Sequence, residues 1–327
     1  MNFEKLTKLQ PKVVDVIQNS IAMNRLVQVI LFEGAKGTPK KDAAYFLASL
    51  LLCENKSACL NCRECRRIAS GIHPRVYFID VIDKTIKKEQ IQDLEYEISK
   101  SGLEEGTRVI IINNIDKATS SASNSLLKFL EEMKEDVYCI LITDNISGVL
   151  STIKSRSQII SFQRISENEL IEEYSEKGID YEVGKVLSKI TNDVSEGMKL
   201  IEEGYLLDII DLVKDINYSF FTGSDPVIVF NEKGKFLLDI ADRMYHQIFL
   251  DLLVLITNDR LYHLLGKYDE IVFKNNISSI GNIYDIPYQN TFKQMEKIIE
   301  YKQRVLYNVN LELLYMSLFV EMRKIND

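Results

Sequence analysis

The feature that most limits the possible folds of this chain is an alternation of short apolar runs and helical patterns in its first half. The runs are rich in Val and Ile and almost wholly apolar, as strands buried on both faces should be. They cover residues 27–33, 76–80, 108–113, 137–143 and 158–162. Helical patterns lie between them at residues 40–53, 88–101 and 119–134. The alternation predicts an α/β fold with a mostly parallel sheet, right-handed crossovers and flanking helices.

The strand patterns stop after Phe162, and the rest of the chain has helical patterns only. Three short helical segments fall within residues 164–203, and Ser166 with Glu169 has the form of a capping box for the first. Longer amphipathic stretches cover residues 235–265 and 290–324. We therefore expect an α/β core at residues 1–163, a small helical domain at residues 164–204 and an all-α domain at residues 205–327.

The formal net charge of −8 argues against a protein that binds DNA by charge alone. Residues 1–163 hold 22 Lys and Arg against 20 Asp and Glu, whereas residues 164–327 hold 18 against 28. Any nucleic-acid contact is therefore expected in the first half. The first twelve residues lack the apolar segment of a signal peptide, and no apolar run is long enough to span a bilayer. These features predict a cytoplasmic location and no contact with membranes.

Four of the five cysteines fall within thirteen residues and form a candidate metal site. They are Cys53, Cys59, Cys62 and Cys65. In a reducing compartment such a cluster favours metal binding over disulfides. Four closely spaced thiolates suit a closed, tetrahedral, structural zinc site, and an iron–sulfur cluster is the alternative. We do not expect the nearby His73 to be a ligand, and we interpret Cys139, inside an apolar run, as a core residue.

The segment GAKGTPKK at residues 34–41 is an altered form of the phosphate-binding pattern G-x-x-x-x-G-K-[ST]. Gly34 and Lys40 occupy the expected places, and Gly37 lies between them. Pro39 stands where the pattern has its second glycine, so one N–H donor is missing and φ is fixed. Lys41 replaces the Ser or Thr whose hydroxyl would bind magnesium.

The second signature of such ATPases is also altered. The apolar run 108–113 continues into Asn113-Asn114, where an acidic pair would hold magnesium and activate water. An amide carries no negative charge and cannot act as a general base. We therefore predict neither ATP binding nor intrinsic ATPase activity. The lysines of the loop, Lys36, Lys40 and Lys41, either hold a stray phosphate at the helix N-terminus or are simply solvated.

Taken in order, the motifs resemble those of the delta-prime subunits of the bacterial DNA polymerase III clamp loader, a family with an AAA+ core, a helical lid and an all-α collar. The matching segments are LFEG, a helix ending in LLLC, the four cysteines, GIHPRVYFID, IIINNIDKATSSASNSLLKFLEE and TIKSRSQII. The resemblance is strong across residues 10–162. Farther on, YNVNLELL at residues 307–314 is similar to the final collar helix.

The resemblance implies two further kinds of site. Arg156 would be an arginine finger that acts in trans on the γ-phosphate bound by a neighbouring subunit, with Ser157 in place of the usual Cys. Without the resemblance, a single Arg before a strand is more often a surface or salt-bridge residue. In related clamp loaders the N-terminus of the helix at 119–134 faces the DNA backbone. Thr119, Ser120 and Ser121 are thus candidate phosphate contacts, with plain helix capping as the alternative.

The function implied is that of a non-catalytic subunit of the DNA polymerase III holoenzyme, a DNA-directed DNA polymerase. It would join tau- or gamma-type motor subunits and a delta-type subunit in a hetero-oligomer that loads a sliding clamp onto primed DNA. Two alternatives remain open. One is an active AAA+ motor subunit, which would need an intact phosphate loop and acidic pair. The other is a zinc-dependent nucleic-acid-binding protein, which would need a basic surface.

Overall fold

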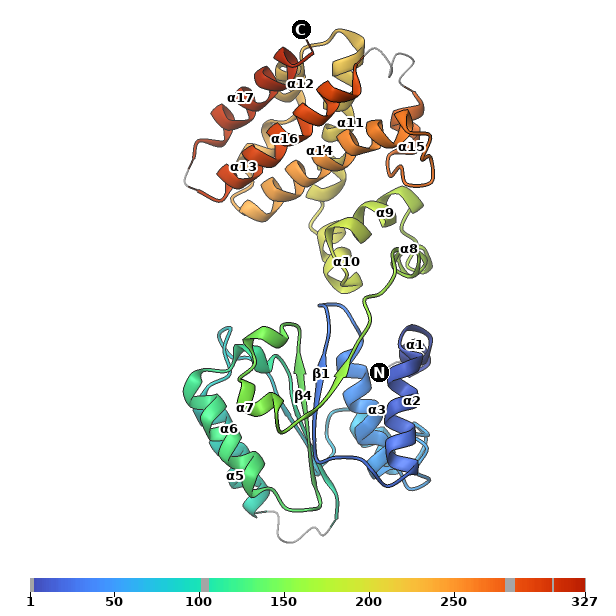
Figure 1. The fold of residues 1–327 in the computed structure, drawn as a ribbon, viewed down its shortest axis with the longest axis vertical. Helices are drawn as coiled ribbons and strands as arrows, with labels where there is room; N and C mark the ends of the chain where they lie inside the picture. Colours follow the sequence, from blue (N-terminus) through green and yellow to red (C-terminus); the bar gives the residue numbers. More distant parts are fainter. Residues whose placement is uncertain (1–2, 101–105, 280–285, 308, 327) are drawn as a thin grey trace. The chain divides into compact units, whose positions relative to one another are not determined.

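The structure is a computed structural model that describes residues 3–100, 106–279, 286–307 and 309–326. The chain divides into two compact units, Met1–Ile165 and Ser166–Asp327 (Figure 1). The expected further boundary at residue 204 stays a prediction. Residue 101, at the end of the helix predicted at 88–101, and residue 308, inside the stretch predicted at 290–324, lie outside the described residues.

The first unit contains a five-stranded sheet in the order β2-β3-β4-β1-β5, with every neighbouring pair parallel. The strands are β1 (Val29–Glu33), β2 (Val76–Ile79), β3 (Arg108–Ile112), β4 (Val137–Thr143) and β5 (Gln158–Ser161). Each predicted apolar run forms one strand, so the predicted parallel sheet is confirmed. Because the strands are parallel, their carboxyl ends meet at one edge, which is where such sheets bind ligands.

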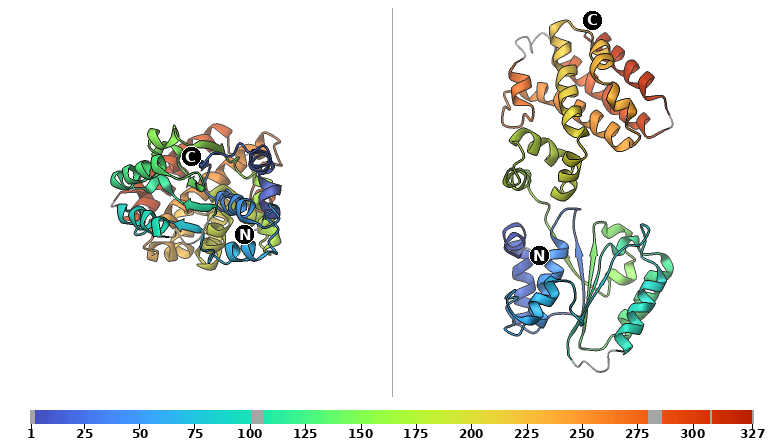
Figure 2. Two further views of the ribbon diagram at one scale, coloured as in Figure 1. Left: turned by 90° about the horizontal axis from the view of Figure 1, so that it is seen from below. Right: turned by 180° about the vertical axis from the view of Figure 1, so that it is seen from behind.

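Helices cover both faces of this sheet (Figures 1 and 2). One face carries α1 (Phe3–Leu9), α2 (Pro11–Ala22), α3 (Lys40–Leu52) and α4 (Arg63–Ala69), and the other carries α5 (Lys88–Lys100), α6 (Ser120–Glu132) and α7 (Ser151–Lys154). Successive side chains of a strand point to opposite faces. Accordingly Ile30 and Phe32 of β1 join the first core, whereas Val29 and Leu31 join the second.

Several short elements of the first unit were not predicted. They are α1, α2, α4, α7 and the 3₁₀ turns η1 (Ile115–Lys117) and η2 (Ile146–Gly148). Gln10, between α1 and α2, is buried, and its side-chain amide exchanges two hydrogen bonds with the backbone of Gln163, which follows β5. The first two helices are thereby joined to the far end of the unit's sequence.

In its described residues the second unit has helices and no strand. The helices are α8 (Glu167–Glu176), α9 (Tyr181–Ile190), α10 (Val194–Glu202), α11 (Tyr205–Thr222), α12 (Pro226–Lys233), α13 (Lys235–Asp239), α14 (Arg243–Leu264), α15 (Lys274–Ser278), α16 (Tyr288–Val305) and α17 (Leu311–Lys324). The capping box of Ser166 and Glu169 is present at the start of α8, as predicted. Within the described residues, no helix combines the length and apolarity needed to cross a membrane.

The two long stretches predicted in this unit are each divided. The stretch 235–265 breaks between α13 and α14, where the side chain of Asp242 accepts a hydrogen bond from the N–H of Met244 and caps α14. The stretch 290–324 breaks between α16 and α17, where Asn310 caps α17 through the N–H of Leu313. In both places a short polar side chain starts a new helix within a continuous amphipathic pattern.

Candidate functional site: the cysteine cluster and the altered phosphate loop

The four clustered cysteines converge at the end of α3. Cys53 ends this helix with extended backbone, Cys59 lies in the following loop, Cys62 caps α4 and Cys65 lies in its first turn. Their sulfur atoms lie within 4.8 Å of one another. The Sγ–Sγ distance is 3.6 Å between Cys53 and Cys59 and 3.9 Å between Cys53 and Cys62. Tetrahedral coordination with metal–sulfur bonds of about 2.3 Å separates the sulfurs by about 3.8 Å, so the set fits a metal ion.

Backbone N–H groups orient two of these sulfurs, and hydrogen bonds lower the pKa of Cys53 and Cys62. The N–H of Cys62 donates to Sγ of Cys59, and the N–H of Cys65 donates to Sγ of Cys62, each at 3.4 Å. Burial acts to raise the pKa of Cys53, but hydrogen bonds from the backbone of Cys59 and its neighbours lower that pKa to about 6. The N–H of Cys65 likewise lowers the pKa of Cys62. Since thiolates are the metal-binding form, the cluster can hold a metal ion.

His73 is not part of the cluster, and it joins the cysteine segment to the residues before β2. Its Nδ1 accepts a hydrogen bond from the N–H of Arg75 at 3.1 Å, which leaves the proton on Nε2. Nε2 donates to Glu64 of α4 at 2.6 Å. Burial, opposed by the hydrogen bond to Glu64, lowers the pKa of His73 below its ordinary value. The imidazole is therefore neutral near pH 7 and acts as a structural link.

The altered phosphate loop lies between β1 and α3, and its lysine bonds to its own loop. Lys40 is buried, and its Nζ donates to the carbonyls of Gly34 and Ala35 and to the hydroxyl of Thr38, each at 2.8 Å. The same nitrogen lies 2.9 Å from a carboxylate oxygen of Asp144, which follows β4. An ammonium has three protons to donate, so these contacts use its full capacity.

Gly34 is required by close packing against the end of β5. A Cβ at this position would lie 2.8 Å from Cβ of Phe162 and 3.0 Å from its carbonyl oxygen. Gly37 has φ of 85°, in the left-handed region that favours glycine. Pro39 precedes the first residue of α3 and offers no side-chain cap. The cation of this loop, Lys40, is thus held by protein oxygens.

At the end of β3 two amides stand beside a carboxylate from the neighbouring strand. Nδ2 of Asn113 donates to Oδ2 of Asp80, and Nδ2 of Asn114 donates to Oδ1, both at 2.9 Å. Burial acts to raise the pKa of Asp80, but these two hydrogen bonds outweigh it and lower the pKa. Both oxygens of Asp80 are therefore occupied by amide donors.

Arg156 lies on the surface between α7 and β5. Its guanidinium Nη2 pairs with Glu131 of α6 at 2.7 Å, and its Nη1 donates to the carbonyl of Thr152 at 3.3 Å. The side chains of Arg156 and Glu131 are 43% and 49% exposed. An ion pair this exposed contributes only about 0.2–1 kcal/mol, so the guanidinium is held weakly.

Thr119, Ser120 and Ser121 begin α6, and the first of them caps it. Oγ1 of Thr119 accepts a hydrogen bond from the N–H of Ala122 at 3.2 Å and lies 3.1 Å from the hydroxyl of Ser121. Ser120 and Ser121 are exposed. The capping interpretation therefore describes Thr119, while the two serines lie in the first turn of the helix.

The structure brings together some of the predicted residues and adds two that the sequence analysis missed. The loop lysine lies beside Asp144, and the two asparagines lie beside Asp80. Each of these acids follows an apolar strand, which is the only signal the sequence offers. The cysteines lie at the other end of α3 from Lys40, and a helix of thirteen residues separates its ends by about 18 Å.

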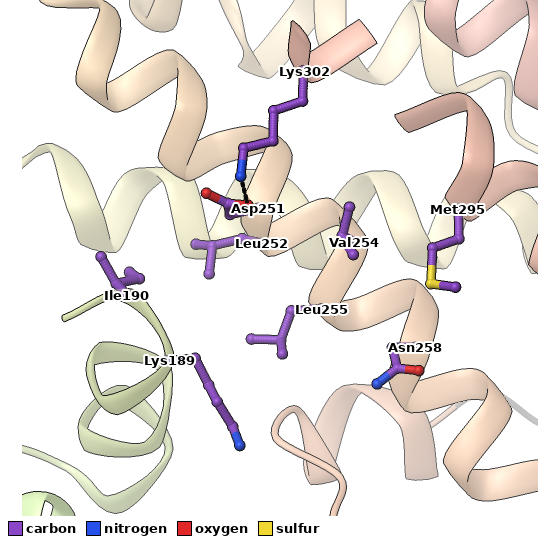
Figure 3. Close-up of a pocket in the computed structure, with 9 residues that line it drawn as sticks. All are labelled: Lys189, Ile190, Asp251, Leu252, Val254, Leu255, Asn258, Met295 and Lys302. Carbon is purple, nitrogen blue, oxygen red and sulfur yellow. Dashed lines mark hydrogen bonds and ion pairs between the residues drawn. The ribbon is translucent and has the colours of Figure 1, made fainter. Parts of the chain in front are cut away.

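The second unit contains a cavity of about 630 Å³ beside the middle of α14 (Figure 3). Its lining combines apolar side chains with an ion pair between Asp251 and Lys302, drawn as a dashed line in Figure 3. Lys189 of α9 and Met295 of α16 line it from two other helices. Lys189 is itself paired with Glu167, 2.6 Å away, so both lysines of this cavity are neutralised by local acids.

Comparison with known proteins gives several matches to subunits of DNA polymerase III. A family model described as DNA polymerase III, delta subunit, matches residues 9–166. A Bacillus subtilis protein named DNA polymerase III subunit delta′ is 32% identical over 323 residues, which is 95% of each chain. A Buchnera aphidicola DNA polymerase III subunit gamma is 27% identical over 250 residues, 70% of this chain and 68% of that protein.

Among solved structures, a DNA polymerase III gamma subunit-related protein from Thermotoga maritima covers 95% of this chain and 99% of its own. The sequence identity is 14% and the TM-score is 0.42, so this likeness carries no argument about function.

Proposed function

The chain belongs to the DNA polymerase III delta-prime family, and from this premise we propose that it is a non-catalytic clamp-loader subunit. In the proposed hetero-oligomer its AAA+ core and its helical second unit support neighbouring ATPase subunits of tau or gamma type, beside a delta-type subunit. The assembly loads a sliding clamp onto primed DNA. Relatives named gamma and tau also match this chain, which supports a common architecture for the proposed neighbours.

The non-catalytic part of the proposal rests on the residues that follow β3. Asn113 and Asn114 offer no carboxylate to a magnesium ion, and their amides occupy both oxygens of Asp80. Phosphoryl transfer depends on metal ions and on a group that positions the attacking water. Lys40 is also bonded to its own loop, which supports the proposal that this pocket neither binds nucleotide nor activates water.

We propose that Arg156 acts on the nucleotide of a neighbouring subunit. A guanidinium is always charged, and its planar fork suits a phosphate. Its exposure and its weak pairing with Glu131 support this role, because the side chain can leave Glu131 at little cost. Ser157, where the family usually has Cys, turns its hydroxyl to the carbonyl of Ile153 at 2.8 Å and leaves the arginine unaffected.

We further propose that the cysteine cluster holds a structural zinc ion. Cys53, Cys59, Cys62 and Cys65 would be its ligands, and four protein ligands leave no position for a reacting molecule. The bound ion would fix the loop between α3 and α4. An iron–sulfur cluster remains the alternative, and the metal content of the purified chain distinguishes the two.

The remaining expectations are also part of the proposal. Residues 164–204 would form the lid, and residues 205–327 would form the collar through which the subunits assemble. The exposed Ser120 and Ser121, with Thr119, would meet a DNA phosphate in the complex. The cytoplasmic location expected from the sequence stays a prediction.

The proposal is tested by the ATPase activity of the reconstituted assembly on primed DNA. Arg156→Ala should lower hydrolysis at the one site that it completes about 10³-fold or more, because arginine fingers contribute a factor of this order, and the total activity should fall by that site's share. The complex should stay intact by size-exclusion chromatography. Glu131→Ala is the matched control: it removes the local partner of Arg156 and should leave the activity unchanged or higher.

Two results would contradict the proposal. If Arg156→Ala left hydrolysis by the assembly unchanged, the finger assignment would be wrong. If the isolated chain hydrolysed ATP with magnesium and Lys40→Ala abolished the activity, the chain would be a motor subunit. Tight binding of the isolated chain to primed DNA at physiological salt would instead favour a nucleic-acid-binding protein.

A further inference from the structure

The outer face of α4, in the cysteine segment, carries a concentration of arginine in an otherwise acidic chain. Arg63, Arg66 and Arg67 lie at helical positions i, i+3 and i+4 and therefore share one face. Cys65 and Ile68 occupy the opposite, buried face. Residues 53–75 contain five Lys and Arg against two Asp and Glu, whereas the whole chain carries a net charge of −8.

The acid within this helix does not neutralise the arginine face. The carboxylate of Glu64 accepts the hydrogen bond from His73 at 2.6 Å and lies 3.5 Å from Arg75. Burial acts to raise the pKa of Glu64, but the hydrogen bond from His73, together with the charges of Arg75 and then Arg67, outweighs it and lowers this pKa. Arg63 and Arg66 are exposed, and their guanidinium groups make no hydrogen bond or ion pair with any residue in the described parts of the chain. Their charges are available to a partner.

An exposed apolar side chain adjoins this face. The end of α4 is closed by two hydrogen bonds, from the N–H of Gly71 to the carbonyl of Ile68 and from the N–H of Ile72 to the carbonyl of Arg67, each at 3.0 Å. Gly71 has φ of 71°, as this type of helix end requires. The motif brings Ile72 next to Arg67 and leaves Ile72 69% exposed.

We propose that this surface, formed by Arg63, Arg66, Arg67 and Ile72, is a docking site for an acidic peptide segment of a partner protein, one that also carries a large apolar side chain. Guanidinium groups bind carboxylates through paired hydrogen bonds, and arginine clusters are a recurrent means of recognising acidic motifs. Ile72 supplies the apolar contact that anchors such a segment.

Nucleic acid fits this surface less well. Proteins that bind single-stranded nucleic acid stack its bases on aromatic side chains. Residues 53–75 contain no Phe, Tyr or Trp, and their one histidine, His73, is buried. A phosphate backbone makes no use of an exposed isoleucine. The inference does not depend on the function proposed for Arg156, because the two concern different residues and different measurements.

The test measures binding of a short fluorescent peptide of aspartates around a single leucine to the full-length chain, by anisotropy at about 0.15 M salt. A second peptide replaces the leucine with serine, and a short DNA duplex is a third probe. The variant carries Arg63→Ala, Arg66→Ala and Arg67→Ala. The control variant makes the same charge change at exposed positions elsewhere in the first unit, through Arg25→Ala, Lys88→Ala and Lys134→Ala.

The triple arginine variant should weaken binding of the leucine peptide about tenfold or more, while the control variant binds as the parent does. Ile72→Ser should weaken binding of the leucine peptide. It should leave the affinity for the serine peptide, which binds the parent more weakly, unchanged. Equal affinity of the triple variant and the parent would overturn the proposal, as would failure of the parent to bind either peptide. Binding of the duplex alone, lost in the triple variant, would assign the surface to nucleic acid. Thermal unfolding and metal content confirm that each variant is folded.

Discussion

At the scale of single residues, Lys40 acts as a structural cation. It is buried, and its ammonium is surrounded by two carbonyls, a hydroxyl and the carboxylate of Asp144. A buried charge is tolerated only where it is paired and hydrogen-bonded, and the loop meets both conditions. The same residue type that would contact phosphate in an ATPase here joins the ends of β1 and β4.

Lys40→Met should therefore lower stability. The substitution removes a donor from the carbonyl of Gly34, the hydroxyl of Thr38 and Asp144, and we expect a loss of about 1–3 kcal/mol in the free energy of unfolding. Urea denaturation followed by circular dichroism measures it. Lys41→Met is the control, because Lys41 is exposed and its Nζ lies over the ring of Phe78, 4.4 Å from the centroid. Equal stability of both variants would show that Lys40 has no structural role.

Asp259 in α14 should make the stability of the chain depend on pH. Its fully buried carboxylate accepts hydrogen bonds from the N–H groups of Val272 and Phe273. Burial outweighs these bonds and raises the pKa of Asp259 to about 6 in the folded chain. In the unfolded chain the pKa is about 3.9. Folding therefore favours the protonated form, whose stabilising contribution is complete below about pH 4 and is lost as the pH rises through about 6.

Relative to Asp259→Asn, which does not titrate, the parent should lose about 2 kcal/mol of unfolding free energy between pH 4 and pH 6.5, which is most of the effect of a pKa shift of about two units. Denaturation curves of the two proteins across this range provide the measurement. A difference between them that stays constant with pH would contradict the prediction.

At the scale of elements, α8, α9 and α10 pack around one side chain. Tyr174 of α8 is fully buried, and its hydroxyl makes no hydrogen bond within the described residues. A Cβ at Gly197 in α10 would lie 2.0 Å from that hydroxyl, and a Cβ at Gly184 in α9 would lie 3.3 Å from Cβ of Tyr174. Both glycines thus let their helices approach the ring closely.

Gly197→Ala should be destabilising by about 1–3 kcal/mol, because the new methyl group overlaps the tyrosine hydroxyl. Tyr174→Phe alone should be nearly neutral, since it removes a hydroxyl without a partner. The double variant should recover part of the loss, and thermal unfolding of the four proteins gives the coupling between the two sites. Strict additivity would show that the two side chains do not meet.

The sequence predicted the type of an element where its apolar pattern was long, but it did not predict the breaks within helical stretches. The five strands follow from their apolar runs alone. The break before α14 depends on tertiary contacts: the buried imidazole of His246 lies 2.9 Å from the carbonyl of Ile240 and 2.7 Å from the hydroxyl of Tyr315 in α17. Asp242 is a local signal for this break, but a partner about seventy residues away in the chain leaves none, and the pattern alone predicted an unbroken amphipathic stretch at 235–265.

At the scale of the whole molecule, the parts of the site that escaped prediction depend on strand order. Asp80 meets Asn113 because β2 and β3 are neighbours, and Asp144 meets Lys40 because β4 lies beside β1. Neither adjacency can be read from the order of the runs in the chain. The cysteine cluster was predictable because its residues are close in sequence and their chemistry needs no tertiary information.

If the cysteine cluster holds the proposed metal ion, removing that ion should affect α4 more than the rest of the chain. In the loop before α4, three non-glycine residues, Lys56, Ala58 and Leu60, have left-handed backbone, which costs about 1–2 kcal/mol each and needs an opposing constraint. Chelation, or Cys62→Ser, should therefore remove hydrogen-exchange protection in α4 while β3 and β4 keep theirs. Cys139→Ala, outside the cluster, should retain the metal, which mass spectrometry of the native chain measures. Unchanged protection of α4 after metal loss would contradict this account.

The weak surface pair of Arg156 and Glu131 has a consequence for when Arg156 can engage a nucleotide. A contact worth at most about 1 kcal/mol shifts a binding equilibrium by no more than about fivefold, so it is easily exchanged for a stronger anion. In the proposed complex the guanidinium would rest on its own helix while the adjacent pocket is empty and swing outward once a triphosphate arrives. In the free subunit Arg156 would stay paired with Glu131, and binding of nucleotide to the neighbouring subunit would determine when this pair breaks.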